Sequence, residues 1–144
     1  MASAKVVVNK ADGTSYDVRI GEGLIDQVGS DVISRFSPSK AFLLYGASVS
    51  AGDRDRVKSS VRQQGIDVAA CKVPKGSEGR TLACVSEIWQ AMAQAGIGRD
   101  GVVIAFGDAQ TIMVGELVAK LYMGGVHVAV IPTLLNVACT HCLG

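Results

Sequence analysis

A glycine turn between an apolar run and a helical pattern is the first place in this sequence where chemistry could occur. Val102–Phe106 is continuously apolar, and Gly107, Asp108 and Ala109 interrupt it before a helical apolar pattern over Ile112–Tyr122 begins. A turn that ends a strand and opens a helix exposes backbone N–H groups at the positive end of the helix dipole, which suits phosphate. Asp108 also fits a helix cap that accepts a backbone N–H. We favour the cap, because aspartate is one of the residues preferred at that position, and its carboxylate would also repel a phosphate.

The histidines and cysteines do not have the spacing of a metal or redox site. Cys139, His141 and Cys142 are three candidate soft ligands close together, but zinc needs four ligands, usually from two clusters, and no second cluster exists. A redox Cys-x-x-Cys pair ordinarily opens a helix after a strand, which these cysteines do not. His127 falls inside an expected strand, where a single histidine is usually a packing residue. We therefore expect free thiols and no metal ligands.

No catalytic residue is predicted. The sequence contains no Ser/His/Asp or Cys/His arrangement with supporting context, and no Walker loop. A basic cluster near one expected helix alternates with acidic residues and reads as a solvated face (Arg54, Arg56, Lys58 and Arg62, with Asp53 and Asp55).

Strands and helices alternate along the chain and must position these residues. Lys5–Asn9 and Tyr16–Ile20 are β-rich runs joined by an Asp12-Gly13 turn, which predicts a β-hairpin at the amino terminus. Further strands are expected at Ala41–Tyr45, Asp67–Val73, Val102–Phe106 and Val126–Ile131, of which all but Asp67–Val73 read as buried strands. Helices are expected at Leu24–Phe36, Asp53–Gln64, Thr81–Ala95 and Ile112–Tyr122, and Leu82 lies on the apolar, packing face of the third. This alternation predicts a Rossmann-like, doubly wound α/β domain with a mostly parallel sheet. In such a sheet ligands bind at the carboxyl ends of the strands.

The composition fits one globular domain. The 144 residues are 49% hydrophobic and 19% charged, with a net charge of +1, which excludes disorder and gives no electrostatic reason to expect nucleic acid. No apolar stretch reaches the length that spans a bilayer, so no membrane association is expected. The start, Met1–Lys5, lacks the pattern of a signal peptide. We expect a cytoplasmic protein, and an organellar address removed before this sequence begins stays open.

The run Val103–Gly125, followed by Ile131-Pro132-Thr133, resembles 3-dehydroquinate synthase. The family pattern there is an apolar strand, three glycines leading to an aspartate, a helix ending in Tyr-x-Arg-Gly, and then Pro-Thr-Thr. The resemblance continues upstream through Ile20–Gly23, Asp55–Val57, Pro74-x-Gly76 and Ile88-Trp89. It covers nearly the whole chain but only the amino-terminal, nucleotide-binding half of that enzyme. We therefore expect residues 1–144 to form this one domain, without the carboxyl-terminal helical domain that binds metal.

The resemblance implies a lyase of the shikimate pathway, in aromatic amino acid biosynthesis. In that family an NAD- and metal-dependent reaction cyclises a seven-carbon sugar-acid phosphate and eliminates phosphate. By family position, the residues that would bind NAD are Gly76, Arg80, Thr81, Gly107, Asp108, Ala109 and Thr133. The family's metal ligands, one glutamate and two histidines, belong to the carboxyl-terminal domain and have no counterpart here.

Several motif residues of the family are replaced. Only Gly107 remains of the three glycines, the aspartate after them falls on Met113, and the arginine after the helix tyrosine falls on Gly124. The acidic residue that holds the adenosine ribose falls on Gly46. The framework residues persist (Pro74, Gly76, Trp89, Tyr122, Gly125 and Pro132). We therefore expect NAD binding to be weak or absent and this chain alone to be inactive.

Two other interpretations stay open. The chain could be a non-catalytic, divergent homologue (a pseudoenzyme) that serves as a partner-binding or structural subunit of a larger assembly. A glycerol-dehydrogenase-like protein shares the fold, but its loop is also glycine-rich, so Gly107-Asp108-Ala109 fits it no better. The apolar tail at Leu134, Leu135, Val137 and Leu143 predicts contact with a protein partner or a second copy.

Overall fold

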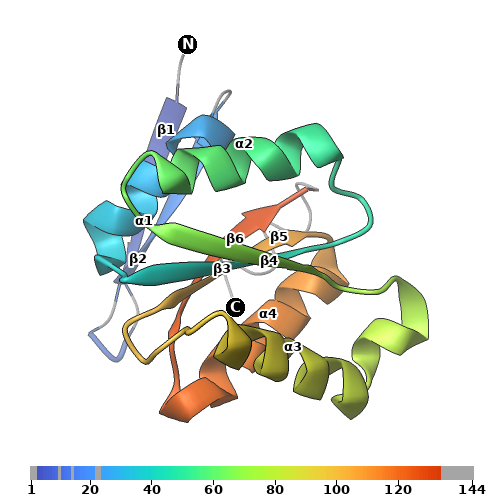
Figure 1. The fold of residues 1–144 in the computed structure, drawn as a ribbon. Helices are drawn as coiled ribbons and strands as arrows, with labels where there is room; N and C mark the ends of the chain where they lie inside the picture. Colours follow the sequence, from blue (N-terminus) through green and yellow to red (C-terminus); the bar gives the residue numbers. More distant parts are fainter. Residues whose placement is uncertain (1–2, 10, 14, 22–23, 134–144) are drawn as a thin grey trace.

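Helices and strands alternate along the chain after an amino-terminal hairpin (Figure 1). The structure, a computed structural model, describes residues 3–9, 11–13, 15–21 and 24–133. The strands are β1 (Ser3–Asn9), β2 (Ser15–Gly21), β3 (Lys40–Tyr45), β4 (Asp67–Lys72), β5 (Val102–Gly107) and β6 (His127–Pro132). The helices are η1 (Leu24–Gln27), α1 (Val28–Phe36), α2 (Ala51–Arg62), η2 (Gly76–Arg80), α3 (Leu82–Gln94), α4 (Ala109–Leu121) and η3 (Tyr122–Gly124).

The central sheet is parallel, with the strand order β4-β3-β5-β6. Strand β5 lies between β3 and β6, and each of its residues is buried, as its continuous apolar run predicts. Strands β1 and β2 pair antiparallel in a separate two-stranded sheet, from Ser3↔Gly21 to Asn9↔Ser15. Between them, Gly13 has a φ of +86°, the conformation that the Asp-Gly turn was expected to supply. The hairpin prediction is confirmed.

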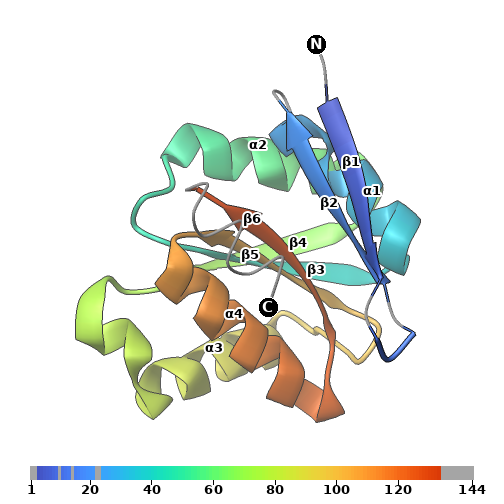
Figure 2. The same ribbon diagram turned by 180° about the vertical axis from the view of Figure 1, so that it is seen from behind.

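Helices cover both faces of the central sheet (Figures 1 and 2). On one face, side chains of α1 and α2 pack against alternate residues of β3 and β5 (Val32, Val57 and Val61 with Leu43 and Ile104). On the other face, α3 and α4 cover the intervening residues (Ile88, Met92, Val114 and Val118 with Phe42, Leu44 and Val103). The doubly wound α/β prediction is therefore confirmed.

Long-range hydrogen bonds join neighbouring helices on each face. The Ser60 hydroxyl of α2 donates to the Asp26 carbonyl at 2.8 Å and accepts the Gly29 N–H at 2.8 Å. Gly29 must stay small, because a Cβ there would lie 2.0 Å from the Ser60 carbonyl oxygen. On the opposite face, the Trp89 indole Nε1–H of α3 donates to the Val118 carbonyl of α4 at 3.2 Å. These contacts fix each helix relative to its neighbour.

Three expectations about burial are wrong. Strand β6 was expected to be buried, but among the described strands it pairs only with β5, and Val128–Ile131 are half-buried because they lie at the sheet edge. Leu82 was expected on the buried face of α3 and is 83% exposed, since it is the first residue of that helix and no earlier turn shields it. His127 is exposed and stacks on Phe36, with ring centroids 4.6 Å apart, instead of packing inside the strand.

Among the described residues, no helix combines the length and the apolar character that crossing a membrane requires.

Candidate functional site

The sheet has one topological switch point, at the carboxyl ends of β3 and β5. The chain leaves β3 for β4 on one side and then crosses to β5 on the other, so the connections that follow β3 and β5 diverge. A doubly wound sheet receives its ligand in the crevice opened by that divergence. Here the crevice lies between Gly46 and Gly107, and the Gly46 N–H donates to the Phe106 carbonyl at 3.0 Å.

The side chain of Thr111 fills this crevice. Thr111 belongs to the first turn of α4 and is only 2% exposed. A Cβ added to Gly46 would lie 2.3 Å from the Thr111 Oγ1, and one added to Gly107 would lie 2.9 Å from the Thr111 Cβ. The two glycines therefore make room for a threonine of this same chain, and the space between the strand ends is occupied.

Asp108 is the amino-terminal cap of α4, as the sequence favoured. Its Oδ1 accepts the Thr111 backbone N–H at 3.0 Å and the Thr111 hydroxyl at 3.0 Å. The carboxylate thus satisfies one of the free N–H groups of the first helical turn and interacts with the positive end of the helix dipole. The same hydrogen bonds fix the rotamer of the threonine that fills the crevice.

Gln110 holds the loop after β4 against the start of α4. Its Nε2 donates to the Pro74 carbonyl at 3.0 Å and to the Gly76 carbonyl at 3.0 Å. Gly79 of the same loop is buried, and a Cβ there would lie 2.5 Å from this Nε2. The loop and the helix start therefore form one hydrogen-bonded unit.

The predicted site residues fall into two groups. Gly107, Asp108 and Ala109 are consecutive at the end of β5 and the start of α4, and the Thr133 N–H donates to the Gly107 carbonyl at 3.0 Å. Gly76 joins this group through Gln110. Arg80 is the exposed last residue of η2, and Thr81 caps α3 by accepting the Cys84 N–H at 3.1 Å.

Sequence reasoning missed Gln110 and Thr111. Both are polar residues directly after the cap, before the apolar run of the helix begins at Ile112, and that contrast was the available signal. Their partners, Gly46 and Pro74, are distant in sequence, so their roles depend on the tertiary fold.

No metal or thiolate chemistry is evident in the part of the chain that the structure describes. No group of three His, Cys, Asp or Glu side chains there could hold a metal ion. The predicted cluster Cys139, His141 and Cys142 lies outside the described residues. Cys71 and Cys84 are free thiols, and burial raises the pKa of both, so neither has the character of an activated nucleophile.

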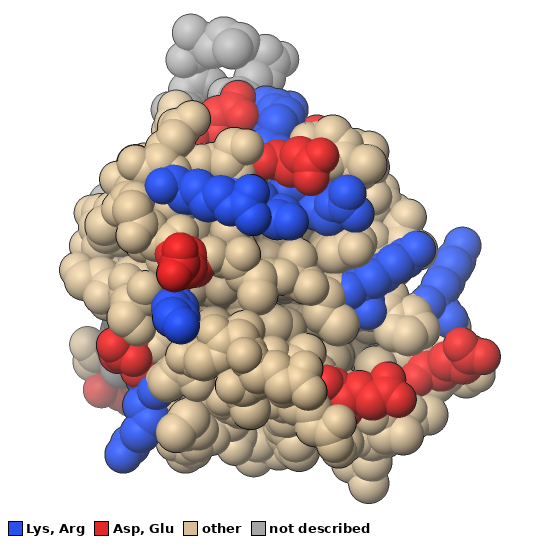
Figure 3. Space-filling model, viewed as in Figure 1, with Lys and Arg blue, Asp and Glu red and all other residues tan. Residues whose placement is uncertain are grey.

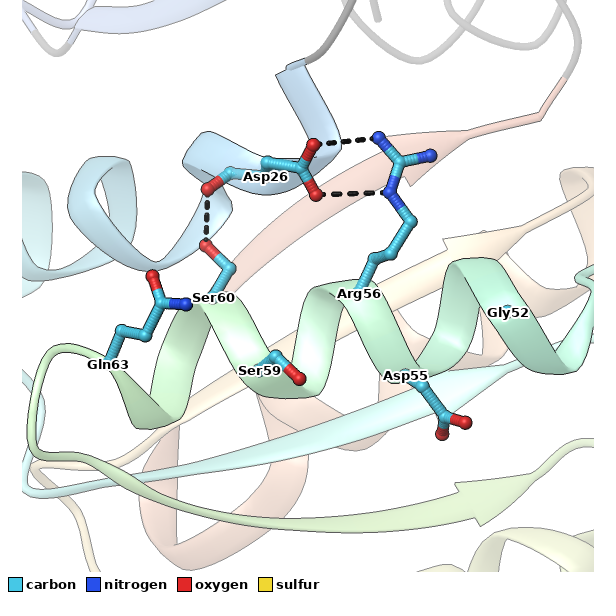
Figure 4. A pocket seen from close by; sticks show the side chains of 7 residues that line it. All are labelled: Asp26, Gly52, Asp55, Arg56, Ser59, Ser60 and Gln63. Atoms are coloured by element: carbon cyan, nitrogen blue, oxygen red, sulfur yellow. Dashed lines mark hydrogen bonds and ion pairs between the residues drawn. The ribbon is translucent and has the colours of Figure 1, made fainter.

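A hollow of about 290 Å³ opens on the surface of α2, with Asp26 and Arg56 at its wall (Figure 4). The Arg56 guanidinium donates to both carboxylate oxygens of Asp26, at 3.0 and 2.8 Å, and to Asp53 at 3.3 Å. This hydrogen bonding lowers the pKa of Asp26 and raises that of Arg56. Asp26 and Arg56 therefore compensate each other's charge, and Asp55, which also lines the hollow, pairs with Arg54 at 3.5 Å. Figure 3 shows the same mixture of basic and acidic side chains on this side of the molecule.

Comparisons with known proteins identify the relatives of this chain. Residues 70–142 match the family described as 3-dehydroquinate synthase N-terminal. The chain is 30% identical over 132 residues to a 3-dehydroquinate synthase of Streptococcus suis, covering 92% of this chain and 37% of the relative. It is 31% identical over 120 residues to that of Saccharopolyspora erythraea, covering 83% of this chain and 31% of the relative. The chain thus spans about a third of the length of these curated relatives.

Solved structures show the same fold at lower sequence identity. A 2-deoxy-scyllo-inosose synthase, complexed with carbaglucose-6-phosphate, NAD+ and Co2+, matches with a TM-score of 0.81 and 19% identity, covering 90% of this chain and 35% of that chain. A 2-epi-5-epi-valiolone synthase of Streptomyces hygroscopicus, with NAD+ and Zn2+ bound, matches with a TM-score of 0.67 and 21% identity, covering 89% and 35%. The family model matches half of this chain, and the folds agree. The chain therefore belongs to the 3-dehydroquinate synthase family and corresponds to the amino-terminal part of its members.

Proposed function

We propose that this chain is a nucleotide-binding-type domain of the 3-dehydroquinate synthase family that forms no dehydroquinate on its own and binds NAD weakly or not at all. The observation that carries this proposal is the filled crevice at the switch point. Thr111 occupies the space between Gly46 and Gly107, and Asp108 places a carboxylate at the start of α4. The residues present do not fit a bound pyrophosphate.

The expected loss of affinity can be approximated from the replaced groups. By the resemblance, Gly46 replaces the acid that would hold the ribose, and Asp108 replaces a glycine beside the pyrophosphate. A hydrogen bond to a charged group contributes roughly 1.5–3 kcal/mol. Losing two such contributions weakens binding by about two to four decades.

The described residues of this chain do not supply the chemical groups that the family's catalysis needs. Metal-assisted elimination needs ligands for the metal and acid–base groups that stabilise the transition state. Among the described residues no such ligand cluster is formed, and about two thirds of the length of the Streptococcus suis relative lies outside the part that this chain matches. The activity of the whole enzyme would therefore require those parts from elsewhere, on a longer chain or on a partner.

Calorimetric titration with NAD tests the binding part of this proposal. We expect no binding in the micromolar range for the unchanged chain. Asp108→Gly should strengthen binding more than Met113→Asp, because only the first removes a negative charge beside the phosphates. A micromolar dissociation constant for the unchanged chain would contradict the proposal, since backbone contacts would then suffice despite Thr111 and Asp108.

An activity assay tests the catalytic part. The purified chain, supplied with NAD and divalent metal, should form no dehydroquinate above background. Turnover that a chelator abolishes would refute this expectation and would show that other ligands bind a catalytic metal.

A second candidate function is that of a non-catalytic, partner-binding or structural subunit. The apolar tail predicted as its contact (Leu134, Leu135, Val137 and Leu143) lies outside the described residues. What favours an association role among the described residues is the exposed apolar face of α4. Light scattering on the chain with and without Asn136–Gly144 tests the tail itself. A monomer in both cases, with a mass of 14.9 kDa for the full chain, would contradict the tail contact.

A further inference from the structure

Tyr45, Arg54 and Lys72 form a basic and aromatic surface at the carboxyl edge of the sheet, which we call the basic corner. Tyr45 is the last residue of β3, and its ring packs on the side of the sheet that α1 and α2 cover. Arg54, the fourth residue of α2, donates from Nη1 to the Tyr45 hydroxyl at 3.3 Å, and its guanidinium carbon lies 5.2 Å from the ring centroid. The ring and the hydrogen bond therefore hold the guanidinium in place.

Lys72 brings a second positive charge to the basic corner. Tyr45 and Lys72 are register partners in the parallel pair of β3 and β4, and such partners point to the same face of a sheet. Cys71, the residue before, packs on the α3–α4 side, so Lys72 points to the α1–α2 side. Figure 1 shows that α2 begins at the end of the sheet where β3 and β4 finish. The two cations therefore share one edge and one face.

The carboxylates near the basic corner are engaged in ion pairs. Asp53 pairs with Arg56 at 3.3 Å, and Asp55, which is 65% exposed, lies 3.5 Å from the Arg54 Nε. A pair as exposed as the second contributes little, and the guanidinium has five N–H donors, so it can bind a further anion. The Arg54 side chain is 31% exposed, which leaves it accessible to a ligand.

Gly46, the residue after Tyr45, has no side chain to bind a ribose hydroxyl. By the resemblance, it replaces the acid that holds the adenosine ribose. An acid has no room here, because a Cβ at residue 46 would lie 2.3 Å from the Thr111 Oγ1. In doubly wound dinucleotide-binding domains, an acid at this place binds the free 2′-hydroxyl, whereas a nearby arginine accommodates a 2′-phosphate. The end of β3 therefore lacks the group that selects NAD and has an arginine beside it.

We propose that the basic corner recognises the 2′-phosphate of a 2′-phosphorylated adenine nucleotide, and that Arg54 determines this specificity. The planar guanidinium can donate two parallel hydrogen bonds to one phosphate, and the Lys72 ammonium adds a second cation. This inference rests on the proposed function, because it takes the pyrophosphate position at Asp108 and Thr111 as closed. Only the adenosine end of such a nucleotide is then bound, and the affinity is low.

Calorimetric titration with 2′-AMP and 5′-AMP, in a buffer free of phosphate, tests the proposal. The two ligands carry one phosphate on the same nucleoside and differ only in where it is attached. 2′-AMP should bind at least about tenfold more tightly, since one hydrogen bond between charged groups contributes that factor or more. Inorganic phosphate should bind more weakly than 2′-AMP, which distinguishes recognition of the nucleotide from recognition of any phosphate.

Two variants of α2 test the role of Arg54. Arg54→Gln should abolish the preference for 2′-AMP, because glutamine can still donate to the Tyr45 hydroxyl but carries no charge. Arg62→Gln is the matched control: it removes the same charge from the other end of α2 and should leave the preference unchanged. Lys72→Gln should reduce the preference without abolishing it. Circular dichroism verifies that the variants fold.

Several outcomes would overturn the proposal. They are equal affinities for 2′-AMP and 5′-AMP, no binding of either ligand at about 10 mM, inorganic phosphate that binds as tightly as 2′-AMP, and a preference that Arg54→Gln leaves intact. Titration with NAD tests the proposed function separately. A micromolar dissociation constant for NAD would refute the closed pyrophosphate position, whereas weak NAD binding without a preference for 2′-AMP would refute only the role of the basic corner.

Discussion

Replacing Asp108 by alanine should destabilise the domain far more than replacing it by asparagine. The Asp108 Oδ1 accepts two hydrogen bonds from Thr111, one from the backbone N–H and one from the hydroxyl. Asparagine keeps a side-chain oxygen that can accept both and loses only the charge. Alanine removes the acceptor and leaves the hydroxyl of Thr111, a residue that is only 2% exposed, without this partner.

The magnitude follows from the interactions that each variant loses. Loss of an amino-terminal cap costs about 1 kcal/mol. A buried hydroxyl that loses its acceptor adds about 1 kcal/mol or more, and the interaction of the carboxylate with the helix dipole adds about 0.3–1 kcal/mol. We therefore expect Asp108→Ala to lower the free energy of unfolding by about 2–3 kcal/mol. Asp108→Asn should lower it by less than about 1 kcal/mol.

Urea unfolding at neutral pH measures both variants, provided that the m-value stays unchanged. Thr111→Val supplies the control for the hydroxyl, and a double-mutant cycle with Asp108→Ala isolates the coupling of the two side chains. If Asp108→Ala and Asp108→Asn lower the stability equally, the hydrogen bonds to Thr111 contribute nothing beyond charge. The conclusion that hydrogen bonds to Asp108 hold Thr111 in the crevice would then be wrong.

Three further predictions concern other parts of the fold. Ser60→Ala should cost about 1–3 kcal/mol in urea unfolding, because it leaves a buried N–H unsatisfied, whereas Ser59→Ala on the exposed side of α2 should cost less than about 0.5 kcal/mol. The Arg56 guanidinium lowers the pKa of Asp26 in the folded state. The unchanged chain should thus exceed Asp26→Asn in free energy of unfolding by a constant amount above about pH 5, and this difference should shrink below about pH 4. A difference that grew in acid would contradict the ion pair. Burial raises the pKa of the Cys84 thiol, so peptide mass spectrometry should find it alkylated by iodoacetamide only after unfolding; rapid labelling of the native protein would show otherwise.

The sequence predicts the fold well because its strongest signals are local. The apolar run at Val102–Phe106 can only be a buried strand or a short buried helical segment, and the glycine turn and helix that follow it favour the strand. Asp12-Gly13 similarly predicts the hairpin from two residues alone. Asp108 as a cap is a local property too, and it is confirmed.

The parts that the sequence leaves open depend on strand order and on distant neighbours. Strand β6 has the apolar composition of a buried strand, and only the sheet order shows that it lies at an edge. Periodicity also fails for α4, because apolar residues on all sides of a helix do not tell which face packs. The filled crevice is invisible in the sequence, since Thr111 meets Gly46 only after two crossovers of the chain.

The hydrogen bond from Trp89 to the Val118 carbonyl has a spectroscopic consequence. The chain contains one tryptophan, and its indole lies between α3 and α4, on the opposite face of the sheet from α1 and α2. Intrinsic fluorescence excited at the red edge therefore reports on one face of the sheet alone. If that signal and far-ultraviolet circular dichroism change together in urea, the two faces unfold as a single cooperative unit; if the fluorescence changes first, the α3–α4 layer detaches while α1 and α2 still cover the other face.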